Sequence, residues 1–281
     1  MLNQALFYAT AGGYALGGVP AIASRYGVYN GGAWTQDSYN NFLSLGGSLD
    51  PTTGAILKNP GNVTLVTANV GYLKPEQQGT FEIGYKGLLT RDVLVDLNYY
   101  HTTYTDFAGS AIVVSKEPTT HQGQPIGAGT FWNLFTNAQN TLKSYGIGLG
   151  VTYNLPGNFA VNANYNYTVL SKVDEGFISG FNTPNNRISF GLENRKLYKN
   201  LGFNLNYRYQ QSFQWQSFFG NATIPAYGVL NAQFNYRLSS IKTIIKMGGT
   251  NLGGKDYRTN FWAPFVGQTY YVSLVFDELL R

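Results

Sequence analysis

One pattern recurs along the chain and restricts its fold more than any other feature: apolar and polar side chains alternate residue by residue. The clearest case is residues 159–170, FAVNANYNYTVL, in which every odd-numbered position is aromatic or aliphatic. Asn162, Asn164 and Asn166 occupy positions between them. Because successive side chains of a β-strand point to opposite faces, this segment predicts a strand with one apolar face and one amide-lined face.

The same alternation predicts about ten antiparallel strands, each near the length that a membrane-spanning strand needs. Three further segments alternate as cleanly, and six others are shorter or less regular. The clean segments are residues 142–154, 202–210 and 230–238, and the others are residues 6–14, 80–88, 93–104, 186–193, 242–249 and 268–277.

The connections between these segments alternate in length. A tight link is followed by a long one along the whole chain. In an antiparallel meander this order puts every tight turn at one end of the sheet and every long connection at the other. The tight links fall near residues 89–92, 156–158, 194–200 and 239–241, and the long ones cover residues 15–79, 105–141, 171–185, 211–225 and 250–267.

The composition of the two faces indicates which side meets water. Only 12% of the residues are charged, against about 25% in ordinary soluble proteins. The polar faces carry Asn, Gln, Thr, Ser and Gly, and tyrosines such as Tyr145 and Tyr153 lie near strand ends, where membrane barrels have aromatic girdles. The sequence therefore predicts an all-β fold, an antiparallel transmembrane β-barrel with short periplasmic turns and long extracellular loops. A soluble β-sandwich that binds carbohydrate, with its apolar faces buried between two sheets, is a distant alternative.

Several other classes of protein are disfavoured. The net charge of +5 is spread along the chain and forms no basic block, so we expect no nucleic-acid partner. The chain has no cysteine and no run of about 18 apolar residues that would predict a transmembrane helix. Its first twenty residues lack the basic start of a signal peptide.

We expect no catalytic centre, metal site or cofactor, and hence no enzyme. Residues 249–255 read G-x-x-x-x-G-K, as in a phosphate-binding loop, but Asp256 follows where Ser or Thr would bind magnesium. Asp96 and His101 are five residues apart, which places them on opposite faces of a strand. No nucleophile, base and orienting residue converge in the sequence.

Two stretches resemble a known family. Residues 72–87, YLKPEQQGTFEIGYKG, are followed after a short turn by VLVDLNYYHTTYTDFAG, and NLGGKDY precedes GQTYYVSLVFD near the other end. The order of a Leu-Lys-Pro-Glu entry, a Glu-x-Gly-Tyr-Lys-Gly strand and a closing hairpin resembles the barrel of TonB-dependent outer-membrane receptors. The residues that carry the resemblance are Pro75, Glu76, Glu82, Gly84, Tyr85, Lys86, Gly87 and, as the aromatic residue of the last strand, Phe276.

The resemblance implies a place in a larger barrel. Receptors of this family have 22 strands around an N-terminal plug domain and work with the TonB complex. We expect residues 1–281 to form a single segment from the last part of such a barrel, with the plug, the TonB box and the N-terminal strands missing from it. Residues 1–78 would hold a first strand and a long extracellular loop, residues 79–277 nine further strands and residues 278–281 a periplasmic tail, so that both chain ends lie on the short-turn side.

Two sets of side chains are candidates for contact with a solute. Polar side chains of the strands are expected to face a wet lumen, either as a charge ladder along the wall or as a ligand route. Aromatic side chains of the long loops are expected either to capture a ligand or to serve structure, by packing among the loops or by forming an upper aromatic girdle. The lumen set is Glu82, Lys86, Asp96, Asn162, Asn164, Asn166 and Arg208, and the loop set is Trp34, Phe131, Trp132, Trp215, Phe218, Phe219, Phe261 and Trp262.

The resemblance implies a role in binding and active uptake of a scarce nutrient, such as a siderophore, cobalamin, a glycan or a peptide, at the outer membrane of a Gram-negative bacterium. A barrel of ten strands that closes by itself, as a porin or an outer-membrane hydrolase, is the alternative.

The membrane interpretation predicts a simple fractionation result. The protein should stay with the outer-membrane fraction until detergent is added, because its apolar strand faces need lipid or detergent. Its gel mobility should change on boiling as the barrel unfolds. Recovery in the aqueous fraction without detergent, with a mobility that boiling leaves unchanged, would contradict the membrane interpretation.

Overall fold

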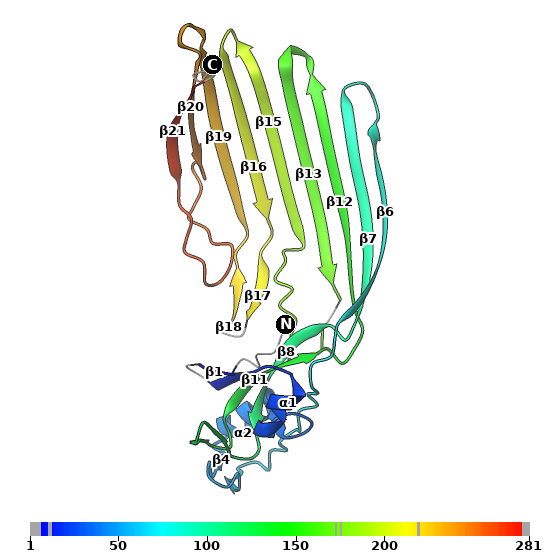
Figure 1. Cartoon of the computed structure of the whole chain (residues 1–281), viewed down its shortest axis with the longest axis vertical. Coiled ribbons are helices and arrows are strands. Elements are labelled where there is room, and N and C mark those ends of the chain that lie inside the picture. Colours follow the sequence, from blue (N-terminus) through cyan, green and yellow to red (C-terminus); the bar gives the residue numbers. More distant parts are fainter. Residues whose placement is uncertain (1–6, 11–12, 172, 175, 218–219, 277–281) are drawn as a thin grey trace.

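A computed structural model of the chain describes residues 7–10, 13–171, 173–174, 176–217 and 220–276. Its largest element is a nine-stranded antiparallel sheet in which each strand pairs with the strands before and after it (Figure 1). The strands are β6 (Gln77–Leu88), β7 (Val93–Thr105), β12 (Leu142–Leu155), β13 (Phe159–Leu170), β15 (Asn186–Tyr198), β16 (Leu201–Gln210), β19 (Tyr227–Leu238), β20 (Thr243–Thr250) and β21 (Thr269–Phe276).

The predicted alternation of short and long connections is confirmed. The tight turns β6–β7, β12–β13, β15–β16 and β19–β20 lie at one end of the sheet and the long connections at the other (Figure 1). The turn after β12 is a single 3₁₀ turn, Pro156–Asn158, in which Gly157 and Asn158 have φ of 78° and 64°. Gly has no Cβ and Asn tolerates the left-handed region, so this LPGN sequence suits a tight reversal.

The apolar face of the sheet is not covered by any other element of the described chain. Phe81 is 62% exposed and Val272 is 71% exposed, and large apolar side chains on the strands between them are exposed too. A soluble sandwich would bury these side chains between two sheets. The exposed face is the lipid-facing surface that the alternation predicts for a membrane barrel.

The stretch before β6 and the β7–β12 and β13–β15 connections fold into a compact unit at one end of the sheet, which we call the loop domain: the described residues of 7–76, 106–141 and 173–178 (Figure 1). Its six-stranded sheet has the order β1-β2-β11-β8-β14, with β3 on β8, and β2 runs parallel to β11. The elements of the loop domain are β1 (Phe7–Thr10), β2 (Gly13–Leu16), α1 (Pro20–Ala23), η1 (Ser24–Tyr26), β3 (Ala33–Thr35), α2 (Gln36–Ser44), β4 (Ser48–Leu49), β5 (Ile56–Lys58), β8 (Ala108–Ser115), β9 (Thr119–His121), β10 (Gln124–Ile126), β11 (Phe131–Asn137) and β14 (Phe177–Ile178).

A shared apolar core joins the stretches of chain that make the loop domain. Leu16, from the stretch before β6, packs in one cluster with Val113 and Trp132, which come from the β7–β12 connection. A smaller cluster joins Phe177 to the loop ends of β7 and β12. The long loops are therefore held together by burial of apolar side chains from distant parts of the sequence.

The strand predicted at residues 6–14 does not belong to the nine-stranded sheet, and this prediction is wrong. The described residues there form the β1–β2 hairpin, and β2 pairs with β11 because Leu16 is buried in the loop domain and Tyr14 packs on Trp132. The described sheet consequently has nine strands. Its first strand, β6, starts at the end of the sheet where the long connections lie. The expectation that the chain enters the sheet from the short-turn side is also wrong. The predicted tail, residues 278–281, lies outside the described residues.

The remaining elements are a hairpin in the β16–β19 connection and a 3₁₀ turn after β19. The hairpin consists of β17 (Phe213–Ser217) and β18 (Gly220–Ile224), and the turn is Ser239–Ile241. None of the helices within the described residues has the length and apolar character that crossing a bilayer requires.

The lipid-facing assignment predicts that an introduced arginine lowers stability much more on the apolar face of the sheet than on the polar face. Leu149→Arg, in the middle of β12 on the apolar face, should lower the free energy of unfolding by about 2–4 kcal/mol, because the guanidinium would enter hydrocarbon. The matched change Asn164→Arg, one strand away on the polar face, should cost less than about 0.5 kcal/mol. Urea unfolding in lipid vesicles measures both, and equal losses would contradict the assignment.

Candidate functional site: the polar face and the loop domain

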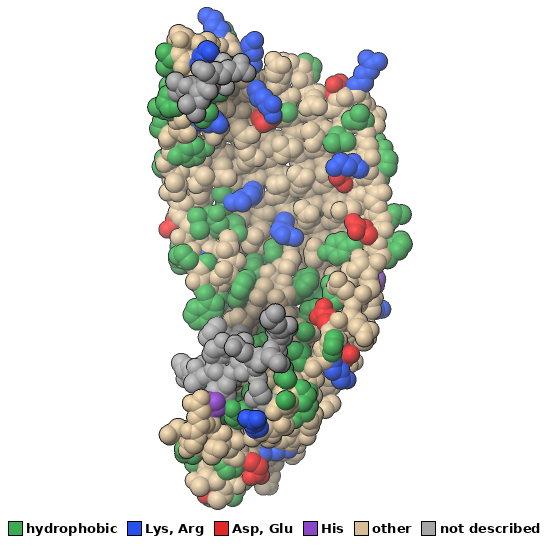
Figure 2. Space-filling model, in the orientation of Figure 1, with side chains coloured by type: hydrophobic (Ala, Val, Ile, Leu, Met, Phe, Trp, Pro, Cys, Tyr) green, Lys and Arg blue, Asp and Glu red, His purple; other side chains and the backbone are tan. Residues whose placement is uncertain are grey.

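The seven residues predicted to line a lumen share the polar face of the sheet, on which uncharged side chains predominate (Figure 2). Strand register connects them in rows that cross the sheet. One row runs Lys86, Asp96, Gly150, Asn164, Ser189 and Arg208 from β6 to β16. His101 pairs with Phe81 and Tyr145 on the other face, as the spacing predicted.

Three glycines of β12 leave room for the polar side chains of the neighbouring strands. A Cβ on Gly146 would come within 2.5 Å of the Tyr100 ring, and a Cβ on Gly148 within 2.3 Å of the Asn98 amide. The Tyr100 ring thus lies across β12, and its hydroxyl reaches Thr168 on β13 at 3.1 Å. These glycines explain why the polar face of β12 lacks large side chains.

The described charges on this face are partly paired. Lys86 Nζ lies 3.0 Å from Asp96 Oδ2 across the β6–β7 pair. Neighbouring polar side chains also bond to one another. Gln233 Nε2 donates to Asn235 Oδ1 at 2.7 Å, and Gln233 Oε1 accepts a hydrogen bond from the Tyr271 hydroxyl at 2.8 Å. A wall built in this way offers both donors and acceptors to a polar solute.

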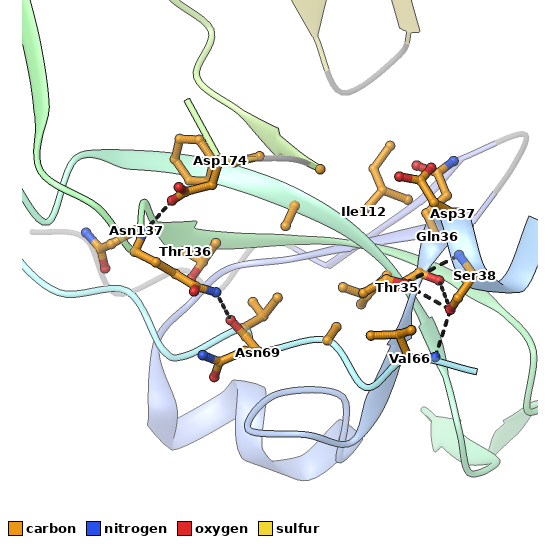
Figure 3. A pocket seen from close by; sticks show the side chains of 17 residues that line it. Thr35, Gln36, Asp37, Ser38, Val66, Asn69, Ile112, Thr136, Asn137 and Asp174 are labelled. Carbon is orange, nitrogen blue, oxygen red and sulfur yellow. Dashed lines mark hydrogen bonds between the residues drawn. The ribbon is translucent and has the colours of Figure 1, made fainter. Parts of the chain in front are cut away.

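A pocket of about 390 Å³ opens in the loop domain (Figure 3). It lies between the start of α2, the stretch Val66–Val70, the strands β8 and β11, and the residues Asp174, Gly176 and Phe177. Thr35 caps α2, since its Oγ1 accepts the Ser38 N–H at 3.4 Å, and Ser38 Oγ in turn accepts the Val66 N–H at 3.1 Å. One wall of the pocket is thereby fixed by side-chain bonds to backbone.

Asp174 fixes the opposite side of this pocket. Its Oδ2 accepts the backbone N–H groups of Gln139 and Asn140 at 3.0 and 3.2 Å, and its Oδ1 accepts the Asn140 side-chain amide. Gln139 Nε2 then donates to the Asn69 carbonyl at 2.8 Å. Residues from three separate connections meet here, which sequence spacing alone does not reveal.

A neighbouring amide joins two stretches of the loop domain that lie next to the sheet. Asn137 Nδ2 donates to the carbonyls of Lys74 at 3.0 Å and Asp106 at 2.6 Å, and Asn137 Oδ1 accepts the Lys74 N–H at 2.6 Å. Glu76 Oε2 accepts the Ala108 N–H at 2.8 Å just beside it. The stretches just before β6 and just after β7 are thus bound to each other and to the end of β11.

Buried tyrosines in the loop domain stay uncharged. Burial, together with the neighbouring Tyr72, raises the pKa of Tyr29 far above its ordinary value, and burial raises the pKa of Tyr39. The Tyr29 hydroxyl instead donates to the carbonyls of Leu16 and Phe135 at 3.2 and 3.0 Å. These phenols serve packing and hydrogen bonding rather than proton transfer.

The predicted loop aromatics separate into buried and surface groups. Trp132 has 0% of its surface exposed, and Trp34 and Phe131 pack against the cluster of Tyr39 and Phe42. These three residues thus pack inside the loop domain.

Phe261 and Trp262 stand on the β20–β21 connection, with ring centroids 4.9 Å apart, and Trp262 is 59% exposed. Trp215 lies on β17 and is half-buried. Phe218 and Phe219 lie outside the described residues.

A second pocket, of about 380 Å³, was not predicted. It lies between the start of β19 and the β20–β21 connection, and Lys255, Asp256 and Arg258 are among its lining residues. Tyr227 stacks on Tyr257 there, with ring centroids 4.4 Å apart. In the described residues no group of acidic or histidine side chains is placed to hold a metal ion.

Together these features define a class: the wall of an outer-membrane β-barrel, apolar on one face, polar on the other, with its long loops folded at one end. A family model described as TonB dependent receptor-like, beta-barrel matches residues 7–254. The chain belongs to this family, whose members are outer-membrane proteins of Gram-negative bacteria. The resemblance seen in the sequence is confirmed.

Solved structures show the same fold. The siderophore receptor PirA from Acinetobacter baumannii matches with 18% identity and a TM-score of 0.52, over 74% of this chain and 32% of that one. The FrpB iron transporter from Neisseria meningitidis, F3-3 variant, matches with 17% identity and a TM-score of 0.51, over 73% of this chain and 30% of that one. The copper transporter OprC matches with 18% identity and a TM-score of 0.53, over 73% and 32%.

The chain therefore spans about a third of the length of these structures, and the likeness concerns the fold alone. A comparison with curated proteins finds no match.

The two tryptophan environments predict different losses of stability. Trp132→Ala should destabilise the loop domain by about 3–5 kcal/mol, because it removes a fully buried indole. Trp262→Ala, at an exposed position, should change its stability by less than about 0.5 kcal/mol. The rate of limited proteolysis within residues 106–141 reports the difference, and similar rates in the two variants would contradict the packing described here.

Proposed function

We propose that the chain forms part of the wall and of the extracellular cap of a TonB-dependent transporter that takes up a scarce nutrient. The observation that carries the proposal is the juxtaposition of three features: an exposed apolar face, a polar face of amides and isolated charges, and a loop domain with a pocket at one end of the strands. A solute would be captured at the loops and would pass along the polar face.

The open edges of the sheet support a place in a larger barrel. In the described structure β6 and β21 are the two ends of the strand order and do not pair with each other. Lipid offers no hydrogen bonds to such edges, so further strands must cover them. We propose that these strands belong to the rest of a 22-stranded receptor, with a plug inside it, and that the described strands do not close a porin or hydrolase by themselves.

The chemistry proposed is binding and gated passage, without a catalytic step. The similar structures are those of a siderophore receptor, an iron transporter and a copper transporter. A metal or metal chelate is thus the first ligand class to test, and cobalamin, glycans and peptides are the others that the resemblance implies. The energy for passage would come from the TonB complex.

Uptake assays test this proposal. Cells that carry the protein should accumulate a radioactive iron chelate or copper, and the uptake should fall to background when TonB is deleted or the proton gradient is collapsed. A strain that lacks only this protein is the control for other receptors. Uptake that depends on the protein but continues without TonB would overturn the proposal in favour of a passive pore.

A further inference from the structure

Two arginines stand side by side on the polar face of the sheet. Arg208 of β16 lies opposite Ser189 of β15, and Arg187 of β15 lies opposite Gln210 of β16. The two arginines are thus diagonal neighbours on one face of an antiparallel pair, where Cβ atoms are about 7–8 Å apart or somewhat less. Both side chains are exposed on that face.

The positions around this pair are uncharged. Arg187 also lies opposite Asn166 on β13, and Arg208 lies opposite Val229 on β19. None of the positions diagonal to the pair on the two flanking strands carries a charge. Among the described residues neither guanidinium forms an ion pair.

The acidic groups of this face are too far away or already engaged. Asp96 shares a row with Arg208 but lies four strands away, about 19 Å at the usual strand spacing, and is paired with Lys86. Glu193 lies six residues along β15 from Arg187, about 20 Å. It accepts the Asn204 amide at 3.3 Å and lies 3.6 Å from Arg195.

Two adjacent guanidiniums without a carboxylate repel each other. An anion bound between them would offset this electrostatic repulsion. Each guanidinium presents a planar fork of donors that matches the two oxygens of a carboxylate or phosphate. Asn166, Ser189 and Gln210 add neutral hydrogen-bonding groups in the same two rows. From this arrangement we propose that Arg187 and Arg208 bind the oxyanion group of a solute that passes along the wall.

The second pocket lies beside this site, toward the loops. Gln210 lies two residues beyond Arg208 on β16, and its partner on β19, Tyr227, also lines that pocket. The pocket brings Lys255 and Arg258 near the stacked Tyr227–Tyr257 rings, and Asp256 is the one carboxylate in its described lining. A basic pocket at the loops followed by a basic pair on the wall gives an anion two successive stations.

This inference rests on the proposed function, since it takes the polar face as the wall of a solute path. Its test is equilibrium binding of radiolabelled citrate and of inorganic phosphate to the assembled receptor, purified in detergent, in low-salt buffer. Arg187→Gln and Arg208→Gln should each weaken binding about tenfold. Added salt should weaken binding to the unmodified protein and have little effect on the double variant.

Matched controls separate the site from general charge. Lys246→Gln removes another basic residue of the same face, and Lys86→Gln removes one that is paired with Asp96, so both should leave the affinity unchanged. Arg208→Lys keeps the charge, loses the planar fork and should give an intermediate affinity. Gel mobility before and after boiling shows that each variant is folded, and the lysine variant serves if a glutamine variant is not.

Several outcomes would overturn the inference. Equal affinities in the arginine and control variants would do so, as would an unmodified receptor that binds neither anion. A loss of barrel stability in the glutamine variants without anion binding would mean that the guanidiniums pair with carboxylates of the protein. TonB-dependent uptake that persists in any of these cases leaves the proposed function standing, because the two assays are independent.

Discussion

The obligation to pair every backbone N–H and C=O group governs this structure. Within lipid no water is available to an open strand edge, so spanning strands must find partners on both sides. The seven inner strands of the sheet meet this need by the simplest topology, in which each pairs with the strands on either side of it, whereas β6 and β21 pair on one side only in the described structure. Because the backbone is satisfied by strand pairing, the side chains of the two faces can differ in polarity. The period-two alternation places apolar side chains toward lipid and polar side chains toward water.

The polar face depends on that regular pairing. Because the register is unbroken over most of the sheet, residues far apart in sequence fall into rows, and Lys86, Asp96, Asn164 and Arg208 share one of them. The glycines of β12 also depend on this register, because it places them opposite Asn98 and Tyr100, whose side chains cover the strand. A slip of one residue in any pair would turn amides toward lipid.

The strands were predictable because their signal is local. Alternation and turn residues such as Gly157 and Asn158 act within a few residues, so they can be recognised in a single sequence. The loop domain was not predictable, because its folding depends on contacts between stretches about a hundred residues apart, such as Leu16 with Trp132. The hairpin near residues 7–16 was misassigned for this reason, since short alternating strands look alike whether they face lipid or pack on a parallel neighbour.

The same locality limits what could be said of the site. The polar side chains that share one face of the strands can be recognised from the period-two alternation alone. The burial of Trp132 and the hydrogen bond between Asp174 and Gln139 depend on tertiary contacts, which the alternation does not report.

The hydrogen bonds of the Asn137 side chain have a mechanical consequence. One side-chain amide ties the backbone just before β6 and just after β7 to the end of β11, so none of these three stretches can shift alone without breaking hydrogen bonds of Asn137.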